Sequence, residues 1–374
     1  MDTLYLAGPT AVDRAILSAA GVPFRQLEVG ALRGVGPLWA AQNMVRLAQA
    51  VLACRRLITS FRPDVVLVTG GYVSVPAALA AAQARLPVLL YLPDAEPGWA
   101  VRLLAPLATR IALSFEVAWP ALRRWERKLV VTGYPLRAEF ASATRLQGQE
   151  QFGLEPSAPV LLVYGGSRAA RRLNVAVAQA LPGVLAVVQV IHICGADDLA
   201  QLEAAAAQLP PHLRARYHLH AYLHAGMAAA MAAADLALCR AGASTLAELP
   251  AIGLPAILVP YPYSGQHQAR NAAFLAAAGG AVVVPDEELD GPRLMRHVSE
   301  LVQDRARLAQ MAAAMRCLAR PDAATALARE VAALAGLPAG SGSGEWPATT
   351  GDGRPRPDNP GEVAQIGQGW PAGR

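Results

Sequence analysis

The stretch that decides the fold is RAGASTLAELPAIGLPAILVPYPYSGQHQARN, residues 240–271. A short apolar run, 236–239, leads into a turn at Gly242, and the chain then enters a helix through two small hydroxyl residues. Glu248 stands in the first turn of that helix, and a second apolar run, 256–259, follows it. The order strand, glycine turn, helix, strand predicts one unit of a parallel α/β sheet.

The start of this helix suits an anionic ligand that also carries a diol. Free N–H groups and the helix dipole favour negative charge at a helix N-terminus. Glu248 repels phosphate, but its carboxylate accepts hydrogen bonds from two vicinal hydroxyls, as on a ribose. The stretch therefore predicts a nucleotide-sugar site. The alternative is an ordinary helix start, since Ser and Thr are common caps and acidic first turns are favoured by the dipole alone.

The composition describes a large, apolar chain with room for two cores. It has 374 residues, 54% hydrophobic and 16% charged, with a mean hydropathy of +0.29. Uncharged runs at 65–84 and 174–196 are broken by Gly or Pro, so they predict a strand with a helix in place of a membrane span. The opening Met1-Asp2 lacks a basic segment, and no signal peptide is expected.

The four cysteines lie far apart without a CxxC pair or a neighbouring histidine pair. They are expected to be reduced thiols in a cytosolic protein, and neither a metal nor another cofactor is expected.

Positive charge is concentrated in the first part of the chain. Residues 1–145 contain 16 Arg and Lys against 9 Asp and Glu, within an overall net charge of +5. Such a surface suits lipid headgroups or nucleic acid. Because no nucleic-acid module accompanies it, an anionic membrane is the expected partner and nucleic acid is not. The helix expected at 37–61 either packs in the core with a solvated arginine edge or lies at the membrane interface.

Strands alternate with helices along the chain, which predicts doubly wound parallel sheets with ligands at the carboxyl ends of the strands. Residues 1–140 form the expected first Rossmann-like domain, and 160–335 form the second. Residues 141–159 lose the periodicity and are expected to be a linker, and the Gly- and Pro-rich segment 336–374 a disordered tail.

Five motifs stand in one order across almost all of residues 1–335. They are GGYVSVP (70–76), GYPLR (133–137), GGSRAARRLN (165–174), RAGASTLAEL (240–249) and HQARNA (267–272). In this order and spacing the chain resembles the MurG family of peptidoglycan glycosyltransferases. The resemblance implies the GT-B fold, two Rossmann-like domains facing across a cleft. It also implies inverting transfer of N-acetylglucosamine from UDP-GlcNAc to lipid I (undecaprenyl-pyrophosphoryl-MurNAc-pentapeptide), which forms lipid II, at the cytoplasmic face of the cell membrane with peripheral attachment.

The resemblance also implies which residues bind UDP-GlcNAc. Arg137 and Ser167 would lie near the nucleotide and diphosphate, Glu248 would bind the ribose, and Gln268 the sugar. The expected set is Asp94, Arg137, Ser167, Asn174, His224, Ala243, Ser244, Thr245, Leu246, Ala247, Glu248, His267 and Gln268. Within it, Asn174 would support the GGS loop, 243–247 would offer backbone groups to phosphate, and 223–224 would flank the uracil. Asn271 is expected to be a helix-packing residue.

The chain departs from the family pattern in three places. The family begins with a strand and a GGTGGH loop that have no counterpart here, so we expect either an upstream start or a truncated paralogue. The family's HEQN is YLPD at 91–94, which places Asp94 where an Asn contacts substrate. Gly265 and Ala169 replace a usual Asp and a usual Gly. The general base is therefore unassigned, with Asp94 or Glu96 as candidates.

Two other functions stay open on sequence alone. One is a different GT-B activity, on a glycolipid or as a UDP-GlcNAc epimerase, although the carboxylates and histidine that an epimerase needs are not found. The other is a non-catalytic paralogue that binds UDP-sugar.

Overall fold

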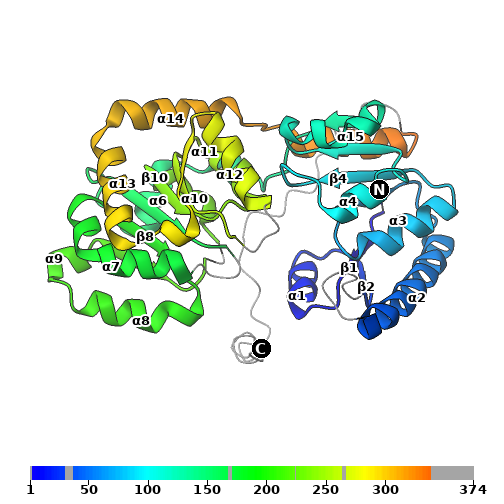
Figure 1. Cartoon of the computed structure of the whole chain (residues 1–374), viewed down its shortest axis with the longest axis horizontal. Helices are drawn as coiled ribbons and strands as arrows, with labels where there is room; N and C mark the ends of the chain where they lie inside the picture. Colours follow the sequence, from blue (N-terminus) through cyan, green and yellow to red (C-terminus); the bar gives the residue numbers. More distant parts are fainter. Residues whose placement is uncertain (1, 30–36, 167–170, 224, 263–266, 338–374) are drawn as a thin grey trace.

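The computed structural model describes residues 2–29, 37–166, 171–223, 225–262 and 267–337. Figure 1 shows two α/β domains side by side, the first half of the chain in blue and cyan and the second in green and yellow. Among the described residues, no helix combines the length and the apolar character needed to cross a bilayer.

The first domain is built on a parallel sheet in the order β3-β4-β5-β6, with a separate parallel pair β1-β2. Its central strand β4 is buried along its whole length, as expected for a strand covered on both faces. The strands are β1 (Tyr5–Ala7), β2 (Phe24–Gln26), β3 (Val66–Val68), β4 (Val88–Leu92), β5 (Arg110–Leu113) and β6 (Leu129–Val131). The helices are α1 (Ala11–Ala19), α2 (Pro37–Phe61), α3 (Ser74–Gln83), α4 (Trp99–Leu104) and the 3₁₀ turns η1 (Glu116–Ala118) and η2 (Pro120–Lys128).

The second domain is built on a parallel sheet in the order β12-β11-β10-β7-β8-β9. Its strands are β7 (Val160–Tyr164), β8 (Gln189–Ile193), β9 (Tyr217–His220), β10 (Leu236–Cys239), β11 (Ala256–Leu258) and β12 (Ala281–Val283). Its helices are α5 (Glu139–Ser142), α6 (Arg145–Phe152), α7 (Arg171–Val187), α8 (Ala196–Ala207), α9 (Pro211–Arg214), α10 (Met227–Ala233), α11 (Thr245–Ile252), α12 (His267–Ala277), α13 (Gly291–Gln303) and α14 (Arg305–Cys317), with a 3₁₀ turn η3 (Asp286–Glu288).

The segment 141–159, expected to be a linker, differs from that expectation. It contains the end of the short α5, which packs against α11, and the whole of α6, which packs against α10. Phe140 and Phe152 are buried in the core of the second domain. The contact is close: a Cβ at Gly148 would lie 2.1 Å from the carbonyl oxygen of Ala229. These helices therefore belong to the second domain.

The last helix belongs to a different domain from the one expected, since residues 160–335 were all expected in the second domain. Helix α15 (Ala323–Leu334) packs on the first sheet, where Leu327 and Val331 cover Leu89. Arg110 Nε donates to Glu330 Oε2 at 3.2 Å. In Figure 1 the orange α15 accordingly lies against the first domain. The chain thus crosses between the domains twice.

Two local expectations are corrected. The run 174–196 contains the expected helix and strand as α7 and β8, but the break does not fall at Pro182, because α7 runs through it to Val187 with Leu181 and Val184 buried on the core side. The sequence also predicts a helix at 118–128, but the chain there is 3₁₀, since the charged run 120–128 buries only Leu122 and offers no apolar stripe to hold an α-helix.

Candidate active site

The second sheet has a topological switch point between β7 and β10. From β7 the chain proceeds through β8 and β9 on one side, whereas β10 to β12 lie on the other. In open parallel sheets a ligand-binding crevice forms outside the carboxyl ends of the strands at such a point. The Gly165-Gly166 turn follows β7, and the turn at Gly242 follows β10. Both glycine segments therefore lie at the carboxyl ends of the two strands that flank the switch point.

The turn at Gly242 leads into α11, with Ser244 as its N-cap. The N–H groups of Ala247 and Glu248 already donate to the Ser244 carbonyl, at 3.0 and 2.9 Å. The N–H groups of Ser244, Thr245 and Leu246 are those that the helix itself leaves without an internal partner. The Leu246 side chain is buried in the core, so only its backbone can serve a ligand. Of the expected set 243–247, the backbone N–H groups of residues 244–246 are therefore the ones left for a ligand.

The carboxylate of Glu248 lies in the first turn of α11, partly buried, and accepts a hydrogen bond from Ser244 Oγ at 3.3 Å. Burial raises its pKa; the Ser244 hydrogen bond and the charge of Arg137 oppose that rise. A carboxylate held in this way has acceptor capacity left for a ligand that brings its own hydroxyl donors.

Arg137, which lies just before α5, also faces the Glu248 carboxylate. Its guanidinium pairs with Glu139 at 2.8 Å and lies 5.6 Å from the centre of the Phe140 ring. The side chain is 60% exposed. Its effect on the pKa of Glu248 shows that the two charges are close together, so the structure brings these two predicted residues to one site.

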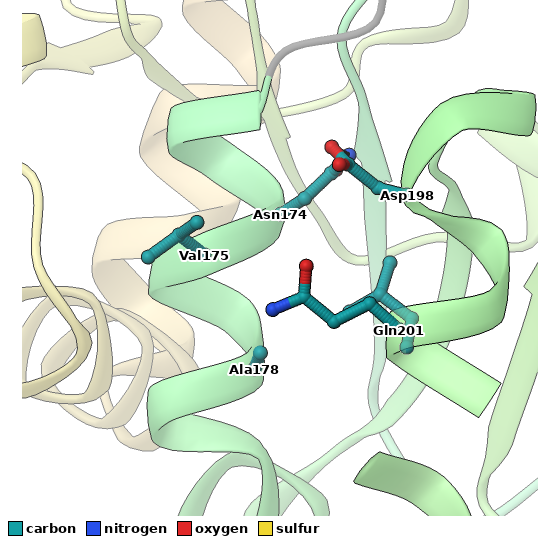
Figure 2. Close-up of a pocket in the computed structure, with 6 residues that line it drawn as sticks. Asn174, Val175, Ala178, Asp198 and Gln201 are labelled. Carbon is teal, nitrogen blue, oxygen red and sulfur yellow. Dashed lines mark hydrogen bonds between the residues drawn. The ribbon is translucent and has the colours of Figure 1, made fainter. Parts of the chain in front are cut away.

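Asn174 has a different setting from the one expected. Its Nδ2 donates to the Cys194 carbonyl at 2.8 Å and to Asp198 Oδ2 at 2.7 Å, and its Oδ1 lies 3.0 Å from His192 Nε2. Figure 2 shows it facing Asp198, and both residues line a small pocket. Because every polar group of the carboxamide has a protein partner, Asn174 ties α7 to the next strand and has no group left for the donor.

The remaining predicted site residues come from α12 and from the loop after β4. Gln268 Oε1 accepts from the backbone N–H of Tyr261 at 2.9 Å. His267 lies against Gly98 of the first domain, and its Nδ1 is buried with no hydrogen-bond partner among the described residues. Asp94 accepts from Asn271 Nδ2 at 3.2 Å. The structure thus places Asp94 and His267 at the junction of the two domains and bonds Gln268 within the second domain, while Ser167 and His224 lie outside the described residues.

Sequence reasoning missed two residues of this site. Tyr134 lies near enough to Glu248 and Asp94 for their charges to raise its pKa, after the larger effect of burial. Arg240 is buried, pairs with Asp286, and donates to the Val259 carbonyl at 3.0 Å, bracing β10. An arginine between an apolar run and a glycine turn is a signal visible in the sequence, whereas the position of Tyr134 depends on the tertiary fold.

The fold is that of solved glycosyltransferases and related nucleotide-sugar enzymes. The structure of MurG from Acinetobacter baumannii matches with a TM-score of 0.67 and 24% identity, covering 88% of this chain and 90% of that one. UDP-GlcNAc 2-epimerase from Neisseria meningitidis bound to UDP-GlcNAc matches with a TM-score of 0.59 and 14% identity, covering 88% and 99%. Two Rossmann-like domains facing each other in this way define the GT-B fold, as the sequence predicted. At these identities the likeness establishes the fold alone.

The sequence comparisons are more specific. The glycosyltransferase family 28 N-terminal domain matches residues 1–113, and the C-terminal domain of the same family matches residues 160–327. The UDP-N-acetylglucosamine–N-acetylmuramyl-(pentapeptide) pyrophosphoryl-undecaprenol N-acetylglucosamine transferase of Roseiflexus sp. (strain RS-1) is 42% identical over 363 residues, 87% of this chain and 82% of the relative. The protein of that name from Halothermothrix orenii is 35% identical, covering 86% and 88%. The chain therefore belongs to glycosyltransferase family 28, in the MurG family of N-acetylglucosamine transferases.

Proposed function

We propose that this protein transfers N-acetylglucosamine from UDP-GlcNAc to lipid I and so forms lipid II for peptidoglycan synthesis. The observation that carries the proposal is the 42% identity, over most of both chains, to a transferase named for this reaction. The donor site supports it, because the switch-point crevice combines a helix N-terminus with a carboxylate in its first turn.

Different described residues would bind the diphosphate, the ribose and the sugar of UDP-GlcNAc. The free N–H groups at the start of α11 would bind the diphosphate, and the helix dipole would favour its charge. Glu248 would accept the ribose hydroxyls, with Arg137 near the nucleotide. Gln268 and His267, at the start of α12, would face the sugar.

In an inverting transfer an acceptor hydroxyl attacks the anomeric carbon, the bond to the diphosphate breaks, and UDP leaves. Negative charge grows on the diphosphate, where the start of α11 would stabilise it. The hydroxyl proton must pass to a base. Asp94 is our candidate, because it lies in the first-domain loop that faces α12 and only one of its oxygens, Oδ1, has a hydrogen-bond partner among the described residues.

We further propose that α2 attaches the protein to the cytoplasmic face of an anionic membrane. One side of this helix packs into the first-domain core through Ala50 and Cys54. The other side exposes Val45 by 58% and Leu52 by 53%, with Arg55 following one turn later. The helix thus has both the core-packed face and the apolar, basic outer face that the sequence left as alternatives, the pattern of an interfacial helix.

The test is transfer of labelled GlcNAc from UDP-GlcNAc to purified lipid I by the full chain, with product identified as lipid II by mass. A lipid-linked sugar without the N-acetylmuramyl-pentapeptide serves as the comparison acceptor. Transfer to lipid I alone supports the proposal. Preference for the comparison acceptor would indicate another glycolipid glycosyltransferase, and UDP-GlcNAc binding without transfer would indicate a non-catalytic role.

A further inference from the structure

Helix α12 presents one continuous face to the first domain. His267, Arg270, Asn271 and Phe274 share this face because their spacing is i, i+3, i+4 and i+7. Arg270 Nε contacts Glu96 Oε2 at 2.8 Å, and the rings of Phe274 and Phe115 lie 5.5 Å apart. The four residues thus form a contact between the domains, with Asn271 among them.

Asn271 is completely buried there, with 0% exposure. Its Oδ1 accepts from the backbone N–H of Ala95 at 3.1 Å. Its Nδ2 donates to Asp94 Oδ1 at 3.2 Å and to the Ala241 carbonyl at 3.0 Å. Both amide hydrogens and the amide oxygen are therefore used within the protein, and a buried carboxamide bonded on all sides has a single orientation.

The partners of Asn271 belong to the two halves of the site. Ala241 directly precedes Gly242, so its carbonyl belongs to the turn that opens the donor helix α11. Asp94 and Ala95 lie in the loop 93–98, which leaves the carboxyl end of β4 in the first domain. One side chain therefore connects the donor turn to the loop that holds the candidate base.

We propose that Asn271 is a positioning residue that fixes the loop 93–98 against the donor turn, so that acceptor and donor meet in a reactive geometry. This inference rests on the proposed function for its kinetic consequence, whereas the connection itself can be tested without it. A displacement of about 1 Å at a reacting centre costs on the order of 100-fold in rate.

The first experiment compares the full chain with Asn271→Ala. We expect kcat/KM for lipid I to fall by about 10- to 100-fold, while the Kd for UDP-GlcNAc, measured by calorimetry, stays within about 3-fold. Hydrogen exchange gives a readout that is independent of activity. Because the Ala95 N–H loses its acceptor, exchange at 93–98 should become faster. The matched control is Ala273→Ser, which changes an exposed side chain on the same helix and should leave both measurements near wild type.

Three further variants keep the test decisive if Asn271→Ala folds poorly. Asp94→Asn retains an acceptor oxygen for Asn271, so exchange at 93–98 should stay at the wild-type level whatever happens to transfer. Asn271→Asp loses both donors and places its carboxylate against Asp94. Adding Asp94→Asn to it restores one hydrogen bond with donor and acceptor exchanged, and should recover part of the exchange protection.

Wild-type exchange at 93–98 in Asn271→Ala would overturn the inference. So would wild-type kcat/KM for lipid I, or a loss of UDP-GlcNAc affinity that accounts for the whole kinetic effect, since Asn271 would then act on the donor alone. If the wild-type protein transfers no GlcNAc, the proposed function fails, and the exchange measurements still decide whether Asn271 connects the two loops.

Discussion

Replacing Glu248 by Ala tests the donor site at its most distinctive residue. The carboxylate lies in the first turn of α11, where a phosphate-binding site would gain nothing from negative charge. Hydrogen bonds to a charged group contribute about 1.5–3 kcal/mol each. Glu248 already accepts from Ser244 Oγ at 3.3 Å, and burial penalises its charged form, so part of that gain is offset. We expect a net loss of about 1–3 kcal/mol, which corresponds to a Kd for UDP-GlcNAc about 5- to 150-fold weaker.

The assay is calorimetric titration with UDP-GlcNAc and with an analogue that lacks both ribose hydroxyls. Wild type should prefer the natural donor, and Glu248→Ala should bind the two ligands almost equally, because the variant has no acceptor for the hydroxyls. Glu287→Gln is the control, since Glu287 is an exposed carboxylate elsewhere in the same domain. Unchanged affinity in Glu248→Ala would refute the ribose assignment. The assignment would also be refuted by a loss of equal size for both ligands.

Three other predictions follow from the structure. Burial raises the pKa of Glu248 above the ordinary 4.5, and only its charged form accepts from both hydroxyls. UDP-GlcNAc affinity should therefore fall on acidification at a higher pH than for an ordinary carboxylate. Calorimetry across pH checks this, and Glu248→Gln should remove this pH dependence of the affinity. Replacing both Arg55 and Arg56 by Glu should release the protein from anionic liposomes in a flotation assay while UDP-GlcNAc affinity is kept; retained binding would contradict the role of α2. Gly148→Ala should lower the free energy of unfolding by about 1–3 kcal/mol, because the new Cβ meets the Ala229 carbonyl; an unshifted thermal midpoint would contradict this close packing.

Local patterns in the chain predicted most of the architecture. Apolar runs such as VLLYL at 88–92 and VLLVY at 160–164 became buried parallel strands, because a strand covered on both faces must be apolar throughout. The segment 141–159, expected to be a linker, carries a local signal for a helix. Thr144 and Gln147 form a capping box at the start of α6. The helix has few apolar residues, and only its packing on α10 makes it part of the second domain.

The sequence by itself determined the local geometry of the proposed donor half of the site. The glycine turn, the hydroxyl residues and Glu248 lie within a few positions of one another, so one strand-to-helix connection fixes their geometry. Only the tertiary structure decided how that half meets the other. Asn271 is 177 residues from Asp94 and 30 from Ala241, and its hydrogen bonds with Asp94 and Ala95 exist only when the two sheets face each other. Contacts between positions so far apart depend on the packing of whole domains, and local periodicity contains no record of them.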